Sequence, residues 1–234
     1  LNYVEYGKEN KYDDDIFFQK YSQMSRSQQG LAGAGEWETL RKLLPDFKDK
    51  RVLDLGCGYG WHCIYAMEHG ASSVVGVDIS HKMLEVAKEK THFPQVEYKC
   101  CAIEDVEFPE ESFDVILSSL AFHYVADYEI LVKKIYRILK SGGKLVFTVE
   151  HPVFTAYGTQ DWYYNEKGEI LHFPVDNYYY EGKRTAVFHR TARSRQTGFL
   201  YADDTAVAWR IGREVACETD EIAGSATLIS TGTF

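Results

Sequence analysis

The chain has 234 residues, 45% of them hydrophobic, which suits one globular domain and excludes a disordered chain. The formal net charge of −9 argues against a nucleic-acid partner, because proteins that bind DNA or RNA normally present a basic face. No run of about 18 apolar residues predicts a membrane span, and the first residues have neither the basic start nor the apolar core of a signal peptide, so we expect a cytoplasmic protein.

The first 48 residues predict a helical cap. Three consecutive aspartates, residues 13–15, precede the apolar residues 16–18, and carboxylates are favoured at the start of a helix by its dipole. Residues 36–44 place apolar side chains at helical spacing, and Pro45 ends that second helix.

From residue 51 onward, apolar strands alternate with helices. Because each right-handed crossover returns the chain to the same edge of a sheet, this alternation predicts an α/β fold: a Rossmann-like, doubly wound, mostly parallel sheet with flanking helices. Ser80 and Asp127 are suited to cap two of the helices. The expected strands are residues 51–55, 73–77, 96–100, 113–117 and 144–149, and a Ser-Gly-Gly turn at 141–143 is expected before the last one.

Two segments after the core, 49–150, differ from it in composition. Residues 151–182 are rich in aromatic side chains and are expected to form an insertion or lid, which makes 1–182 one domain. Residues 1–182 hold 15 Lys and 4 Arg, whereas residues 183–234 hold 1 Lys and 6 Arg. This atypical tail is either a native C-terminal hairpin or frameshifted or foreign sequence joined after about residue 188, and we expect residues 190–234 to pack poorly.

The five cysteines do not indicate a metal centre. They include no C-x-x-C pair, and no pair of histidines has zinc-binding spacing, so we expect reduced thiols and no metal. The five are Cys57, Cys63, Cys100, Cys101 and Cys217.

A glycine-rich loop follows the first strand. Gly56, Gly58 and Gly60 permit a tight turn and a close approach of the backbone to a ligand, and the free N–H groups of the next helix favour an anionic group. Asp78, 22 positions after Gly56, ends the second strand and can accept hydrogen bonds from both hydroxyls of a ribose. The alternative role for Asp78 is a helix cap or a solvated carboxylate. Together these features predict a nucleotide across the carboxyl ends of the strands.

These residues resemble a known family. Residues 52–60, Val-Leu-Asp-Leu-Gly-Cys-Gly-Tyr-Gly, are similar to the first motif of the class I S-adenosylmethionine (SAM)-dependent methyltransferases, and residues 74–79 resemble their second motif. Further similarities follow in order at residues 107–114, 118–124 and 139–143, so the resemblance covers about residues 50–150. Residues 35–37 and 150–152 additionally resemble a bacterial subgroup of small-molecule methyltransferases.

The resemblance implies a set of contacts to SAM. The glycine loop would frame the methionine end, Asp78 would bind the ribose, and a backbone carbonyl would accept a hydrogen bond from the methionine ammonium. Many members have Asp where this chain has Ala102, which leaves only a backbone contact to the adenine there. The implied cofactor-binding residues are Asp54, Gly56, Cys57, Gly58, Gly60, Asp78, Ile79, Met83, Ala102, Ile103 and Ser118.

The family also implies transfer of a methyl group to a small-molecule acceptor beyond the fourth and fifth strands. His151 and His123 are the candidate catalytic residues, although His151 can instead be a turn residue before Pro152 and His123 a core or capping histidine. Tyr21, Met24 and Arg26 lie in a region that often covers the cofactor in this family, or belong to an ordinary packed helix.

Two other functions stay open at this point. An NAD-dependent oxidoreductase would carry G-x-G-x-x-G, whereas here the third glycine comes one residue early and Trp61 follows it, which favours SAM over NAD. The second alternative is a catalytically inactive SAM-binding protein.

Overall fold

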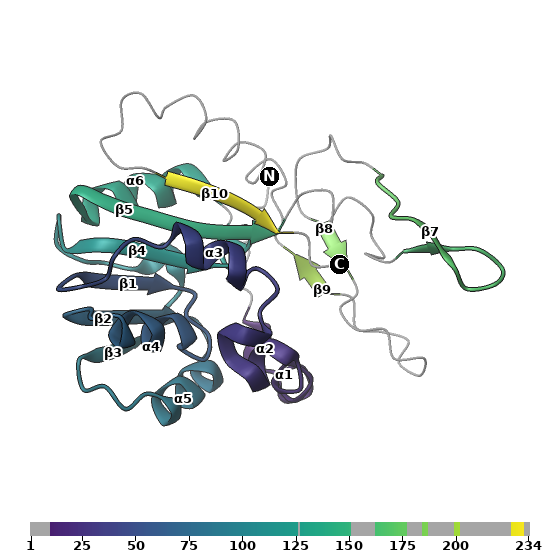
Figure 1. Ribbon diagram of the computed structural model, residues 1–234, viewed down its shortest axis with the longest axis horizontal. Helices are drawn as coiled ribbons and strands as arrows, with labels where there is room; N and C mark the ends of the chain where they lie inside the picture. Colours follow the sequence, from purple (N-terminus) through teal and green to yellow (C-terminus); the bar gives the residue numbers. More distant parts are fainter. Residues whose placement is uncertain are drawn as a thin grey trace, which may run out of the picture.

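A six-stranded parallel sheet forms the centre of the molecule (Figure 1). The computed structural model describes residues 10–125, 127–150, 162–176, 184–186, 199–201 and 226–231. The strand order is β10-β5-β4-β1-β2-β3, and every neighbouring pair is parallel. The strands are β1 (Arg51–Leu55), β2 (Ser73–Asp78), β3 (Val96–Cys100), β4 (Phe113–Ser119), β5 (Leu139–Glu150) and β10 (Ala226–Thr231).

Helices cover both faces of the sheet, as the alternation of strands and helices predicts. The first apolar cluster lies between α6 and one face of the sheet, and the second includes residues of α3, α4 and α5 and lies on the other face (Figure 1). Two short helices, α1 and α2, lie beyond the carboxyl ends of β1 and β2 and form an N-terminal cap. The helices are α1 (Asp15–Ser22), α2 (Ser25–Gln29), α3 (Trp37–Leu43), α4 (Trp61–Glu68), α5 (His81–Lys90) and α6 (Tyr128–Ile138).

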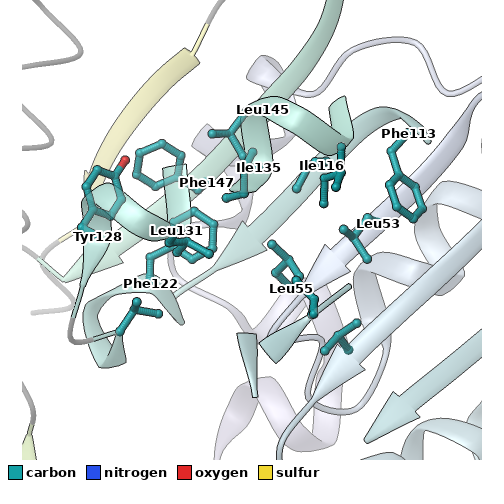
Figure 2. Close-up of a cluster of buried hydrophobic side chains, with 14 of the residues drawn as sticks. Leu53, Leu55, Phe113, Ile116, Phe122, Tyr128, Leu131, Ile135, Leu145 and Phe147 are labelled. Carbon is teal, nitrogen blue, oxygen red and sulfur yellow. The ribbon is translucent and has the colours of Figure 1, made fainter. Parts of the chain in front are cut away.

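The core beneath α6 is built from alternate residues of the strands (Figure 2). Leu53 and Leu55 of β1 point to this side, whereas Val52 belongs to the cluster on the opposite face. This alternation follows from the two-residue period of a strand. Phe122 and Phe147 lie with their ring centroids 5.2 Å apart and are fully buried, so they close the cluster near the carboxyl ends of β4 and β5.

Three of the helices begin at side-chain caps, two of which, Ser80 and Asp127, the sequence predicts. The backbone N–H of Phe17 donates to the Asp14 carboxylate at 2.9 Å, which caps α1. The Ser80 hydroxyl accepts from the Met83 N–H at 3.1 Å at the start of α5, and Asp127 caps α6 in the same way. Each cap satisfies an N–H group that has no partner inside the helix.

The fifth strand differs from the prediction. It begins at Leu139 rather than at Lys144, and the expected turn at 141–143 lies inside it as an irregularity. Phe113 pairs with Leu139 but Val115 pairs with Lys144, so extra residues of β5 are accommodated between these two pairs, where Gly142 adopts φ +74°. The sequence that indicated a turn therefore lies at an irregularity of β5, where 5 positions of this strand face 2 positions of β4 (144 − 139 against 115 − 113).

The tail contributes one strand to the sheet. Residues 226–231 form β10, which pairs in parallel with β5, and α3 contacts it. A native C-terminal hairpin was one of the two alternatives for the tail, but the described strand that joins the sheet, β10, is parallel to its neighbour. Two short antiparallel pairs lie outside this sheet: β6 (Tyr163–Tyr164) with β7 (Ile170–His172), and β8 (Arg184–Ala186) with β9 (Phe199–Tyr201). Most of the tail and much of the expected lid lie outside the described residues, so the poor packing of residues 190–234 stays a prediction.

No helix within the described part of the chain is long and apolar enough to cross a bilayer.

Candidate active site

The glycine loop joins β1 to α4 at the carboxyl edge of the sheet. The N–H groups of Gly56 and Cys57 both donate to the Val77 carbonyl, at 2.8 and 2.9 Å, which holds the loop against the end of β2. Gly56 adopts φ +78°, and a Cβ atom built there would lie 2.3 Å from the Cβ of Ala121, so no other residue fits without movement. Gly58 also has positive φ, but a Cβ atom there would have no neighbour within 4 Å. The loop is therefore tightly packed at its start and open at its middle.

Asp78 lies beside the open part of this loop. Its carboxylate accepts hydrogen bonds from the Gly58 N–H and from the Ser80 N–H, both at 2.9 Å. Burial raises the pKa of Asp78, whereas these two backbone hydrogen bonds lower it. The residue is half-buried, so the carboxylate orders the local backbone and still reaches the surface, and its binding of a ribose stays a prediction.

Asp54 lies beneath the loop, inside the protein. Its side chain is 1% exposed, and one carboxylate oxygen accepts from the Cys63 thiol at 3.4 Å. The other oxygen, Oδ1, has no hydrogen-bond partner among the described residues. Burial raises the pKa of Asp54 to about 7. Cys57 is also buried, and burial raises the pKa of its thiol well above the ordinary value, so neither group is a freely accessible ligand.

Ser118 and Ser119 end β4 next to the loop. The Ser118 hydroxyl donates to the Leu55 carbonyl at 2.8 Å and ties β4 to the end of β1. Leu120 then adopts φ +52°, and its N–H donates to both the carbonyl oxygen and the hydroxyl of Thr148 on β5. This left-handed residue turns the chain so that Ala121 lies against Gly56. Strained backbone of this kind is common at functional sites.

Only some of the residues predicted to contact the adenine lie near the glycine loop. Ile103 lies close to the loop, with its Cδ1 3.5 Å from a Cβ built on Gly56, and Ala102 is buried beside it in the sequence. Ile79 is half-buried, directly after Asp78. Met83, however, is 2% exposed and packs inside the protein, so any contact of its side chain with a ligand stays a prediction.

Of the two candidate catalytic histidines, only His123 lies among the described residues. His123 is buried in the short helix after β4, and burial lowers its pKa to about 3. At neutral pH this ring is therefore uncharged and a weak proton acceptor. His151 lies outside the described residues, so its role stays a prediction.

The N-terminal cap contributes contacts that sequence reasoning missed. Asp13, expected only as part of a helix start, accepts from the Ser80 hydroxyl at 2.6 Å and from the Lys82 N–H at 3.1 Å, which fastens the cap to the start of α5. Tyr21 meets Tyr59 of the glycine loop edge-on, with ring centroids 5.8 Å apart. The cluster of aromatic residues in the first 21 positions was the available signal for a surface packed on the loop.

A second missed residue is Glu36, whose side chain is 1% exposed. Its Oε1 atom forms an ion pair with Arg26 of α2 and accepts from the Ser119 hydroxyl at 3.1 Å. A glutamate at the start of an amphipathic helix is usually exposed, so its burial could not be expected from the sequence.

Comparison with known proteins agrees with this geometry. Residues 53–147 match a family described as a methyltransferase domain. A Haemophilus influenzae protein of uncharacterized function is 35% identical over 212 residues, which is 82% of this chain and 81% of the relative. A Coxiella burnetii ubiquinone biosynthesis O-methyltransferase is 36% identical over 112 residues, 47% of each chain.

Two solved structures are similar over most of the chain. A Listeria monocytogenes protein, provisionally assigned as a SAM-dependent methyltransferase, is 49% identical, covers 76% of this chain and 82% of its own, and has a TM-score of 0.66. A SAM-dependent methyltransferase of Mesorhizobium loti is 41% identical, covers 66% of this chain and 70% of its own, and has a TM-score of 0.62.

A parallel sheet with a glycine loop at its carboxyl edge defines a nucleotide-binding enzyme of the Rossmann-like class. The chain belongs to the class I SAM-dependent methyltransferases, and its cofactor is SAM rather than NAD. The residues present fit that cofactor in two respects: the space over Gly58 is open, and the adjoining Asp78 carboxylate reaches the surface.

Proposed function

We propose that the enzyme methylates a small organic molecule bound beyond the carboxyl ends of β4 and β5. The observation that carries this proposal is the position of the glycine loop and Asp78 over β1 and β2, which leaves the neighbouring strand ends for the acceptor. The Coxiella relative, named for ubiquinone biosynthesis, supports an acceptor from small-molecule metabolism.

The charge of the protein supports a neutral or cationic acceptor rather than a nucleic acid. Residues 1–182 contain 19 basic and 29 acidic side chains, so their balance is 19 − 29 = −10. An acidic body repels a phosphate backbone, whose binding depends on lysine and arginine contacts. Apolar and aromatic walls with a few polar groups suit a small ligand, and we propose the aromatic segment 151–182 as the lid that supplies them.

The cofactor contacts follow the order of the strands. The loop from Gly56 to Gly60 would hold the methionine end, Asp78 the ribose hydroxyls, and Ile79, Ala102 and Ile103 the adenine. When bound, SAM supplies an electrophilic methyl group, and the protein contributes positioning and exclusion of water.

A general base is needed only where the acceptor loses a proton during methylation. We infer that His151 is the better candidate, because it follows β5 at the acceptor end, whereas burial holds the pKa of His123 at about 3. We also propose a cytoplasmic location, which the four free cysteines among the described residues support.

The decisive experiment is a transfer screen with methyl-labelled SAM. The purified protein is offered a panel of phenols, amines and carboxylic acids, together with total RNA and duplex DNA. Label in a small molecule, reduced at limiting SAM when the Asp78→Ala variant is used, supports the proposal. Preferential label in RNA or DNA would reject it.

A further inference from the structure

Two segments beside the glycine loop, the end of β4 and helix α2, both contact the buried carboxylate of Glu36. Glu36 accepts from Ser119 at the end of β4 and pairs with Arg26 of the cap through the same atom, Oε1. Its second oxygen, Oε2, is buried and has no hydrogen-bond partner among the described residues. The ion pair offsets the cost of burying the charge, but a buried oxygen atom without a hydrogen-bond partner still lowers stability.

On one side, the Glu36 carboxylate reaches the turn after β4. The Ser119 hydroxyl that donates to it accepts in turn from the Thr148 hydroxyl at 3.3 Å, and Thr148 accepts from the Leu120 N–H at 3.1 Å. These hydrogen bonds surround the left-handed residue Leu120, which brings Ala121 into contact with Gly56. The Glu36 carboxylate is therefore connected to the start of the glycine loop through the turn after β4.

On the other side, the same carboxylate reaches the cap. Arg26 lies in α2, and Ser27 beside it donates its hydroxyl to the Tyr21 carbonyl at 2.6 Å. Tyr21 packs edge-on against Tyr59 in the same loop. Burial raises the pKa of the Tyr21 hydroxyl, the Arg26 charge lowers it, and the Asp78 charge raises it.

We propose that Glu36 is a positioning residue for the cofactor site. Its buried carboxylate contacts Arg26 of the N-terminal cap and Ser119 at the turn after β4. It thereby holds in place the two segments that pack against the glycine loop. The proposal rests on the placement of SAM over this loop. A carboxylate that served only to stabilise the fold would leave cofactor affinity unchanged when replaced by an isosteric amide.

The test is a double-mutant cycle measured by calorimetric titration of the full chain with S-adenosylhomocysteine. Glu36→Gln keeps the size of the side chain but removes the charge that holds Arg26. We expect Glu36→Gln and Arg26→Gln each to weaken binding about tenfold, and the double variant to be within about twofold of either single one, because both break the same connection. Glu38→Gln, which removes an exposed partner of Arg41 on α3, is the matched control and should bind as the wild type.

Hydrogen exchange supplies a second readout. The peptide covering residues 119–125 should exchange faster in Glu36→Gln, while peptides from β1 and β2 keep the wild-type rate. Unchanged affinity in a folded Glu36→Gln protein, or additive losses in the double variant, would overturn the proposal. If Glu36→Gln does not fold, the double-mutant cycle is made with Arg26→Gln and Ser119→Ala instead, because both residues are less buried than Glu36. Because the probe is the cofactor product, failure to find a methyl acceptor leaves this result standing.

Discussion

Gly58 and Asp78 are 20 positions apart in the chain, yet the Gly58 N–H donates to the Asp78 carboxylate at 2.9 Å. This bond fixes the middle of the glycine loop against the end of β2. The group proposed to bind the ribose therefore also shapes the loop proposed to hold the methionine end.

Replacing Asp78 by Ala should weaken SAM binding by about 1–3 kcal/mol, the scale of hydrogen bonds to a charged group. The loss combines the ribose contacts with the looser loop. Calorimetric titration with SAM measures it, and Glu85→Ala, which removes an exposed charge from α5, serves as the control. Wild-type affinity in a folded Asp78→Ala protein would remove the ribose assignment.

Gly56 at the start of the loop and Gly58 at its middle should respond differently to an added methyl group. Gly56→Ala combines a left-handed backbone, about 1–2 kcal/mol, with a clash against Ala121, about 1–3 kcal/mol, so it should destabilise the protein strongly. Gly58→Ala has only the backbone strain, because the space over it is open, and should fold while binding SAM more weakly.

Thermal unfolding and SAM titration of both variants decide this prediction. Equal loss of stability in the two would show that the open space over Gly58 does not exist in solution.

Asp54 predicts a specific dependence of stability on pH. Burial raises its pKa to about 7 in the folded protein, whereas the unfolded chain releases the proton near about 3.9. The folded state therefore holds the proton more tightly, and this contribution is full below the unfolded pKa and lost as the pH rises through about 7. Relative to Asp54→Asn, the wild type should lose up to about 1.4 kcal/mol per pH unit across this window and nothing more above it.

Urea unfolding of both proteins between pH 4 and 8.5 measures this difference. A gap that does not change with pH would show that the carboxyl group titrates normally.

The base assignment predicts unequal effects of the two histidines. If His151 accepts the acceptor's proton, His151→Ala should slow methyl transfer by about 10²–10⁴-fold with SAM affinity nearly intact. His123→Asn should leave the pH dependence of the rate unchanged, because this buried ring stays neutral above about pH 3. Steady-state rates between pH 6 and 9 compare them, and a small effect of His151→Ala would reduce it to a turn residue.

If the tail packs poorly, most of residues 190–234 should exchange hydrogen rapidly. Residues 226–231 are the segment that the structure pairs with β5. Cooperative protection across the whole tail would contradict poor packing. Resequencing the gene tests the frameshift hypothesis directly.

The sequence predicted the elements that depend on local signals. β1, the caps Ser80 and Asp127, and the glycine loop were recognisable because periodicity, side-chain caps and glycine spacing are local properties. The predicted start of β5 was wrong because a Ser-Gly-Gly sequence occurs both in turns and in irregular parts of strands. Only the pairing with β4 distinguishes the two. Glu36 and Asp13 could not be assigned, since their partners lie 83 and 67 positions away and their burial is decided by packing.

The parallel partnership of β10 with β5 has a consequence for how the protein folds. Strands β1 to β5 occupy residues 51–150, and their widest separation between sheet neighbours is 115 − 52 = 63 positions, between β1 and β4. β10 pairs with β5 across 226 − 145 = 81 positions, the widest separation in the sheet. Chain closure over longer separations costs more entropy and slows the pairing. The five-stranded sheet should therefore form first, with β5 as a temporarily exposed edge, and β10 should add last. During that interval the unpaired edge of β5 is the place where the nascent chain is most prone to associate with other strands.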